Sequence, residues 1–104
     1  MRNCESRPAL YLKSGRVTLC NKRGLHARAS AKFVALAAKY DAKIEVTSVN
    51  DIRQETVEGD SIMELLMLGS AYGEDISITA SGPEAQAAVN ALIDLVKTRF
   101  GEDE

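Results

Sequence analysis

The only histidine of the chain, His26, lies between a glycine and an alanine-rich run in the segment GLHARASA, residues 24–31. The apolar residues that follow recur at helical spacing, so we expect His26 at a helix start. The N–H groups of a first helical turn have no intrahelical partner and, with the helix dipole, favour a bound phosphate. Arg28 can bind the same anion through its guanidinium. The pattern therefore predicts a histidine that accepts a phosphoryl group and passes it on.

The predicted chemistry needs an imidazole nitrogen that is unprotonated, and the positive end of a helix dipole disfavours the imidazolium form. Backbone amides of Ala27 and Ala29, together with Arg28, can stabilise the charge of the transferring group without a general base. We expect the site to be exposed enough for two successive partner proteins. The alternatives are that His26 only caps a helix and that Arg28 is an ordinary solvated residue.

Composition limits the function classes. A chain of 104 residues that is 45% hydrophobic can bury one small core, so we expect a single domain. The net charge of −2 argues against a nucleic-acid partner, and the absence of a long apolar run argues against a membrane span. One histidine and two cysteines without metal-ligand spacing predict no metal, and we expect no cofactor. We expect a cytoplasmic monomer.

The apolar pattern predicts an alternation of strands and helices. Period-two alternation indicates strands at 16–20, 43–47 and 75–80 and a weaker edge strand at 53–57. Helical spacing indicates helices over 27–40, after Ser61, and from residue 84 to a stop at Gly101. The order βαββαβα predicts an α+β fold in which three helices cover one face of a four-stranded antiparallel sheet.

The short helix after Ser61 carries a second set of candidate functional residues. Glu64 stands three residues after Ser61, the spacing of a reciprocal capping box. Leu65 and Leu68 fit the buried side of this helix, and Met67 is expected to pack in the core. The remaining apolar residues are expected to be partly exposed and to form a partner-docking surface: Ile62, Met63 and Leu66. For Met63, core packing remains an equal alternative.

The segments GLHAR (24–28) and SIMELLML (61–68) together resemble the two motifs of the HPr family, the histidine-containing phosphocarriers of the bacterial phosphotransferase system, including its nitrogen-related branch. The resemblance covers about residues 16–100 and agrees with the predicted element order. It implies an HPr-like open-faced β-sandwich. We accordingly divide the chain into an N-terminal extension expected to be flexible (1–15), one HPr-like domain (16–101) and an acidic tail (102–104), which we expect to fray.

The resemblance also implies roles for individual residues and partners. His26 would carry the phosphoryl group on Nδ1, Arg28 would stabilise it, and Ser61 would be modified by a dedicated HPr kinase/phosphorylase. The chain would receive its phosphoryl group from phosphoenolpyruvate-dependent Enzyme I and donate it to an EIIA-type protein, which makes it a carrier and not an enzyme. Whether the acceptor belongs to the sugar or the nitrogen branch stays open.

Several features depart from the family pattern. Ala29 stands where the family usually has proline, segment 48–60 is longer than typical, and residues 1–15 are additional. Asp60 and Glu64 flank Ser61 and would repel a phosphate there, so a plain helix cap is the alternative to a regulatory serine. The alternative functions are a regulatory binding module of the same fold, which acts by docking to enzymes or regulators, and a small α/β ligand-binding domain.

Overall fold

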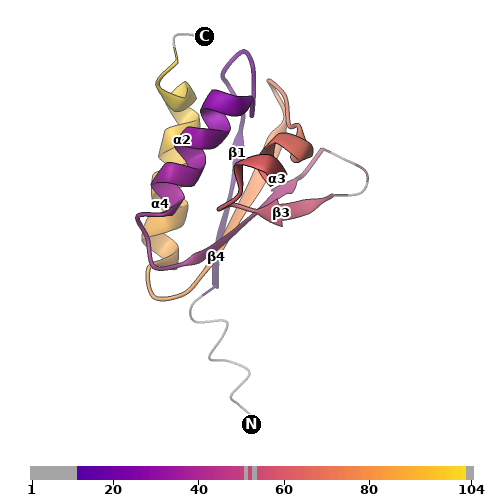
Figure 1. The fold of residues 1–104 in the computed structure, drawn as a ribbon. Coiled ribbons are helices and arrows are strands. Elements are labelled where there is room, and N and C mark those ends of the chain that lie inside the picture. Colours follow the sequence, from indigo (N-terminus) through magenta and orange to yellow (C-terminus); the bar gives the residue numbers. More distant parts are fainter. Residues whose placement is uncertain (1–11, 51, 53, 103–104) are drawn as a thin grey trace.

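The computed structural model describes residues 12–50, 52 and 54–102 (Figure 1). The elements follow the predicted order, with one short 3₁₀ helix, η1, added at the end of the described chain. Their bounds are β1 Leu12–Thr18, α2 Ala27–Ala37, β2 Lys43–Ser48, β3 Thr56–Glu58, α3 Ile62–Leu68, β4 Asp75–Ser81, α4 Ala85–Lys97 and η1 Arg99–Gly101.

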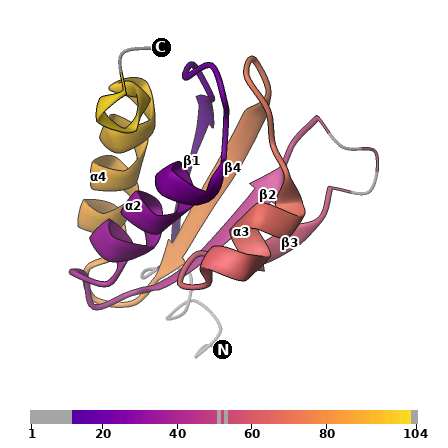
Figure 2. The same cartoon turned by 45° about the horizontal axis from the view of Figure 1, so that its top comes forward.

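The four strands form one antiparallel sheet in the order β1-β4-β2-β3. Ile76 pairs with Val17 of β1 and Ile78 pairs with Val46 of β2, so the central strand β4 carries one side of the core. All three α-helices lie over the same face of the sheet (Figure 2). The predicted α+β fold, an open-faced sandwich, is confirmed.

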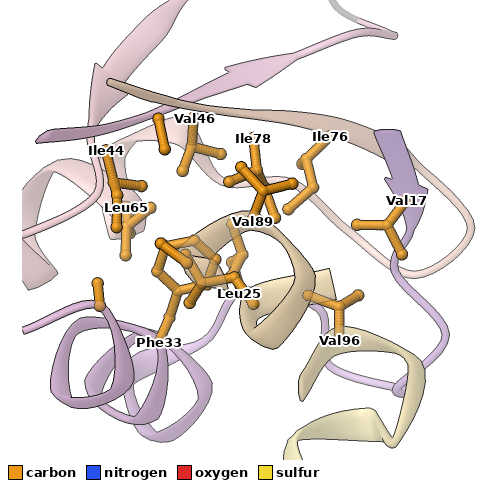
Figure 3. Packing of buried hydrophobic residues seen from close by; sticks show 14 of the residues in the cluster. Val17, Leu25, Phe33, Ile44, Val46, Leu65, Ile76, Ile78, Val89 and Val96 are labelled. Atoms are coloured by element: carbon orange, nitrogen blue, oxygen red, sulfur yellow. The ribbon is translucent and has the colours of Figure 1, made fainter. Parts of the chain in front are cut away.

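The core lies between that sheet face and the helices (Figure 3). Phe33 of α2 and Leu65 of α3 are fully buried, and α4 contributes Leu92 and Val96. Alternation along β2 and β4 sends apolar residues inward and polar ones to the open face. Burial of one face of each element therefore fixes α2 and α3 side by side above the sheet.

Some boundaries differ from the sequence-based ones. β1 includes residues 12–15, which the sequence analysis assigned to the N-terminal extension, and it ends at Thr18 instead of residue 20. The predicted edge strand at 53–57 begins at Thr56, and residue 53 lies outside the described residues. Residues 1–11 and 103–104 also lie outside them. No helix of the described chain is long and apolar enough to cross a bilayer.

Candidate functional site

A tight turn delivers the chain from β1 to His26. The Gly24 N–H donates to the carbonyl of Asn21 (3.1 Å), and Gly24 has φ +61°, which favours glycine. An added Cβ at Gly24 would lie 2.5 Å from the carbonyl oxygen of Ser70. The Leu25 N–H donates to that same oxygen (3.0 Å). The turn is therefore held against the connection between α3 and β4, which brings the start of α2 and the end of α3 together.

His26 is the N-cap of α2, with extended backbone angles of φ −76° and ψ −179°. Its carbonyl accepts from the Ser30 N–H (2.9 Å), the first intrahelical bond. The ring nitrogen Nδ1 accepts from the Arg28 N–H at 3.2 Å. Because a backbone N–H can only donate, Nδ1 must carry a lone pair. The predicted position at a helix start is confirmed, and the histidine also acts as a cap.

The other ring nitrogen reaches a residue that the sequence analysis placed in the frayed tail. His26 Nε2 lies 2.6 Å from Oε2 of Glu102, and the two side chains are 20% and 12% exposed. The expectation that Glu102 frays is wrong for this residue. With Nδ1 unprotonated, the proton of a neutral ring lies on Nε2, where it is donated to the carboxylate.

A turn after α4 brings Glu102 to the histidine. Three consecutive residues, Arg99, Phe100 and Gly101, have positive φ values of 59°, 55° and 76°. The Phe100 side chain is buried in the core, and its carbonyl accepts from Nζ of Lys32 at 2.6 Å. The predicted helix stop at Gly101 was the only sequence signal for this turn, and it did not show where the chain would go next.

Glu102 is held as an anion. Burial raises the pKa of its carboxyl, but hydrogen bonds from Asn21 and His26 and the positive charge of Arg28 lower it by more, so the pKa lies below its ordinary value. Nδ2 of Asn21 donates to Oε1 at 3.1 Å. Arg28 is exposed, and its positive charge is the smallest of the causes that lower this pKa.

Ser61 caps α3, as the sequence predicted: its Oγ accepts from the Glu64 N–H at 3.2 Å. The reciprocal half of the capping box is not formed as predicted. The Glu64 carboxylate instead accepts from the N–H of Glu58 in β3 (3.0 Å). Glu64 thus joins the helix to the edge strand, because the chain before Ser61 brings that amide within reach.

The apolar surface of α3 is larger than predicted. Ile62, Met63 and Leu66 are exposed as expected, with Met63 at 67%. The expectation that Met67 packs in the core is wrong, because 77% of it is exposed, while Leu65 is buried. A seven-residue helix can turn only one narrow side to the sheet, which leaves the rest of its apolar residues outside.

Within the described part of the chain no group of acidic, cysteine and histidine side chains could hold a metal ion. An open recess of about 490 Å³ is lined by Cys20, Lys22, Tyr72 and Arg99. The cysteine there is a free thiol whose Sγ lies 3.4 Å from the carbonyl oxygen of Val96.

Comparison with known proteins supplies the family. The family model described as the PTS HPr component phosphorylation site matches residues 13–98. The chain is 39% identical to the phosphocarrier protein HPr of Pseudomonas aeruginosa over 88 residues, which cover 85% of this chain and 94% of that protein. It is 41% identical to the phosphocarrier protein NPr of Escherichia coli over 87 residues, 84% of this chain and 93% of that protein.

Solved structures of HPr proteins have the same fold as this chain. HPr-C-His of Thermoanaerobacter tengcongensis superposes with a TM-score of 0.79 at 35% identity, covering 88% of this chain and 99% of that one. HPr of Bacillus anthracis superposes with a TM-score of 0.75 at 34% identity, covering 82% and 96%. The chain therefore belongs to the HPr family, the phosphoryl carriers of the phosphotransferase system.

Proposed function

We propose that His26 is the phosphoacceptor of this carrier, taking the phosphoryl group from phosphorylated Enzyme I and passing it to an EIIA-type protein in the cytoplasm. The observation that carries the proposal is the hydrogen bonding of the two nitrogens of the His26 ring. Nδ1 holds a lone pair at the N-terminus of α2, and Nε2 faces a carboxylate. The ring is neither deeply buried nor fully exposed, as a group that two partner proteins must reach in turn requires.

The local amides support the transfer step. The Nδ1 lone pair forms the new nitrogen–phosphorus bond while the donor's bond to phosphorus breaks and its electron pair returns to the donor. The Arg28 N–H, which binds Nδ1 beforehand, is then free to donate to a phosphoryl oxygen. The N–H groups of Ala27 and Ala29 belong to the same first turn and can stabilise the equatorial charge together with the Arg28 guanidinium.

Mass measurement tests the proposal directly. The protein is incubated with Enzyme I and phosphoenolpyruvate, and the intact mass of the wild type is compared with that of His26→Ala. One phosphate on the wild type alone, labile to acid and stable to alkali, is expected. A phosphate on His26→Ala, or none on the wild type, would overturn the assignment.

The role of Arg28 needs a separate variant. Arg28→Ala should slow transfer while leaving the fold intact, because the residue is exposed and its side chain acts through charge. The rate of phosphate incorporation measures this, with Lys39→Ala, an exposed residue beyond the end of α2, as the control. An unchanged rate in Arg28→Ala would remove its assigned role.

Regulation at Ser61 is a second part of the proposal. Its hydroxyl lies at the start of α3, directly before the exposed Ile62 and Met63. A phosphate there would add about two negative charges to the proposed docking surface and would repel an acidic partner. Incubation with an HPr kinase/phosphorylase and mapping of the modified residue tests it. An unmodified Ser61 would leave the serine as a helix cap and remove the regulatory function.

A further inference from the structure

A series of hydrogen bonds leads from the backbone of the turn at Gly24 to the His26 ring. Nδ2 of Asn21 donates to the carbonyl of Gly24 at 2.8 Å and to Oε1 of Glu102 at 3.1 Å. The other carboxylate oxygen, Oε2, lies 2.6 Å from His26 Nε2. Asn21 is fully buried, whereas the Glu102 side chain is 12% exposed.

The carbonyl group of Gly24 determines which groups donate and which accept in the other hydrogen bonds of this series. A carbonyl can only accept, so Gly24 requires the NH₂ group of Asn21 to face it. That orientation holds although Oδ1 of Asn21 is buried without a hydrogen-bond partner among the described residues. A rotated amide would place two acceptors together and lose both bonds of Nδ2. A side chain at residue 102 keeps the bond to Asn21 only if it presents an acceptor.

We propose that Glu102 is a positioning residue for phosphoryl transfer, which holds the His26 ring with its proton on Nε2 and so keeps Nδ1 as the nucleophile. The proposal rests on His26 being the phosphoacceptor. A carboxylate satisfies both neighbours because each of its oxygens accepts. As the N–P bond forms, the ring gains positive charge while Nε2 keeps its proton, and the adjacent carboxylate stabilises that charge. The sequence alone gives no sign of this role, since residue 102 lies 76 positions from the histidine.

Glutamine at residue 102 makes the sharpest test. Its carbonyl oxygen must stay on Nδ2 of Asn21, so its NH₂ group would face His26 Nε2. A donor there needs a lone pair on Nε2, while the Arg28 N–H still needs the lone pair of Nδ1, so a neutral ring cannot keep both hydrogen bonds in Glu102→Gln. If the proton moves to Nδ1 the ring cannot attack phosphorus, and if it stays on Nε2 the two donors repel and turn the ring away. Glu102→Ala removes the carboxylate without imposing a donor. The proposal therefore predicts that Glu102→Gln is the slower of the two variants, whereas a role in anchoring the tail alone predicts that Glu102→Ala is at least as slow.

Two measurements on the full chain separate the outcomes. Nitrogen-15 chemical shifts of the ring report which nitrogen is protonated in the unphosphorylated protein at about pH 8, where an ordinary imidazole is neutral. Rates of phosphoryl acceptance from Enzyme I report function. We expect Glu102→Gln to change the nitrogen-15 shifts of the ring relative to the wild type and to slow acceptance by about tenfold or more, since a wrongly held histidine is costly in enzymes. Glu102→Ala should slow it by less.

The control is Glu45→Gln, which makes the same charge change on β2, away from the histidine. It should keep the wild-type ring form and rate. Wild-type ring shifts in Glu102→Gln, or equal rates in Glu102→Gln and the wild type, would overturn the proposal. Failure of the phosphoacceptor assignment would look different: the wild type would take up no phosphate, while the ring measurement would still report the effect of Glu102.

Discussion

Nζ of Lys32 donates a hydrogen bond to the carbonyl oxygen of Phe100 at 2.6 Å. This contact joins the middle of α2 to the turn that follows α4, two residues before Glu102. Phe100 is itself buried, so its carbonyl is fixed by the core on one side and by the lysine on the other. The turn that carries the carboxylate to His26 is therefore held in part by a side chain from the middle of α2.

Replacing Lys32 should loosen this turn. Lys32→Met keeps most of the side-chain length and removes the donor, and we expect a loss of about 1 kcal/mol in the free energy of unfolding. Urea denaturation measures it, and phosphoryl acceptance should slow as well, because Glu102 is held less firmly. Lys39→Met, an exposed lysine just after α2, is the matched control. Equal stability of the two variants would contradict the role of the contact.

Gly24 should be intolerant of a side chain for two separate reasons. Gly24→Ala combines a left-handed backbone with a Cβ 2.5 Å from a backbone oxygen, and we expect a loss of about 3 kcal/mol or more in the free energy of unfolding. Gly73 has φ +85° with open space around its Cβ position, so Gly73→Ala should cost only about 1 kcal/mol. Thermal or urea unfolding of both variants distinguishes the cost of the positive φ, which both share, from the cost of the close contact with Ser70, which only Gly24→Ala has. Similar losses would show that the close approach to Ser70 contributes nothing.

The cap at the start of α3 should contribute to stability. Ser61→Ala removes the acceptor of the Glu64 N–H, and we expect a loss of about 1 kcal/mol. Ser61→Asp retains a capping oxygen and should stay close to the wild type. Because Asp adds a negative charge at the docking surface, that variant should bind an acidic partner less tightly despite its stability. Unfolding curves and partner titration give the two readouts, and equal stability of Ser61→Ala and the wild type would show that the cap is not needed.

The exposed methionine of α3 should matter more for partners than for folding. Met63→Ala removes an exposed, flexible apolar side chain, so we expect weaker binding of Enzyme I or of the acceptor and a change in unfolding free energy within about 0.5 kcal/mol. Leu12→Ala, at the start of β1, is the control for loss of an exposed apolar residue elsewhere. Calorimetric titration of both variants checks this. Unchanged affinity in Met63→Ala would remove the residue from the docking surface.

The lowered pKa of Glu102 should make part of the stability depend on pH. Its folded-state pKa lies below the ordinary value of 4.5, so its contribution is present above pH 4.5 and is lost as the pH falls through the folded-state pKa. The stability difference between the wild type and Glu102→Gln should therefore shrink with acidification below that value. Urea unfolding at a series of pH values measures the difference. A gap that stays constant down to about pH 2 would contradict the prediction.

Local sequence patterns were enough to predict several of the helices and strands of this protein. Period-two alternation predicted β2 and β4 within one residue, and the spacing of Phe33 and its neighbours predicted α2, because these patterns record which side of an element faces the core. The cap by Ser61 was also predictable, since a cap and its amide lie within four residues. The Glu64 carboxylate was mispredicted because its partner, Glu58, belongs to another element.

The sequence by itself determined the fold class, the helix start at His26 and the candidate phosphate-binding amides, all of which depend on neighbours along the chain. Only the tertiary structure decided what faces the other side of the imidazole. Glu102 reaches His26 because a buried Phe100 and three consecutive left-handed residues turn the chain back over α2. Such a contact between distant segments depends on the packing of the whole core, and no local spacing encodes it.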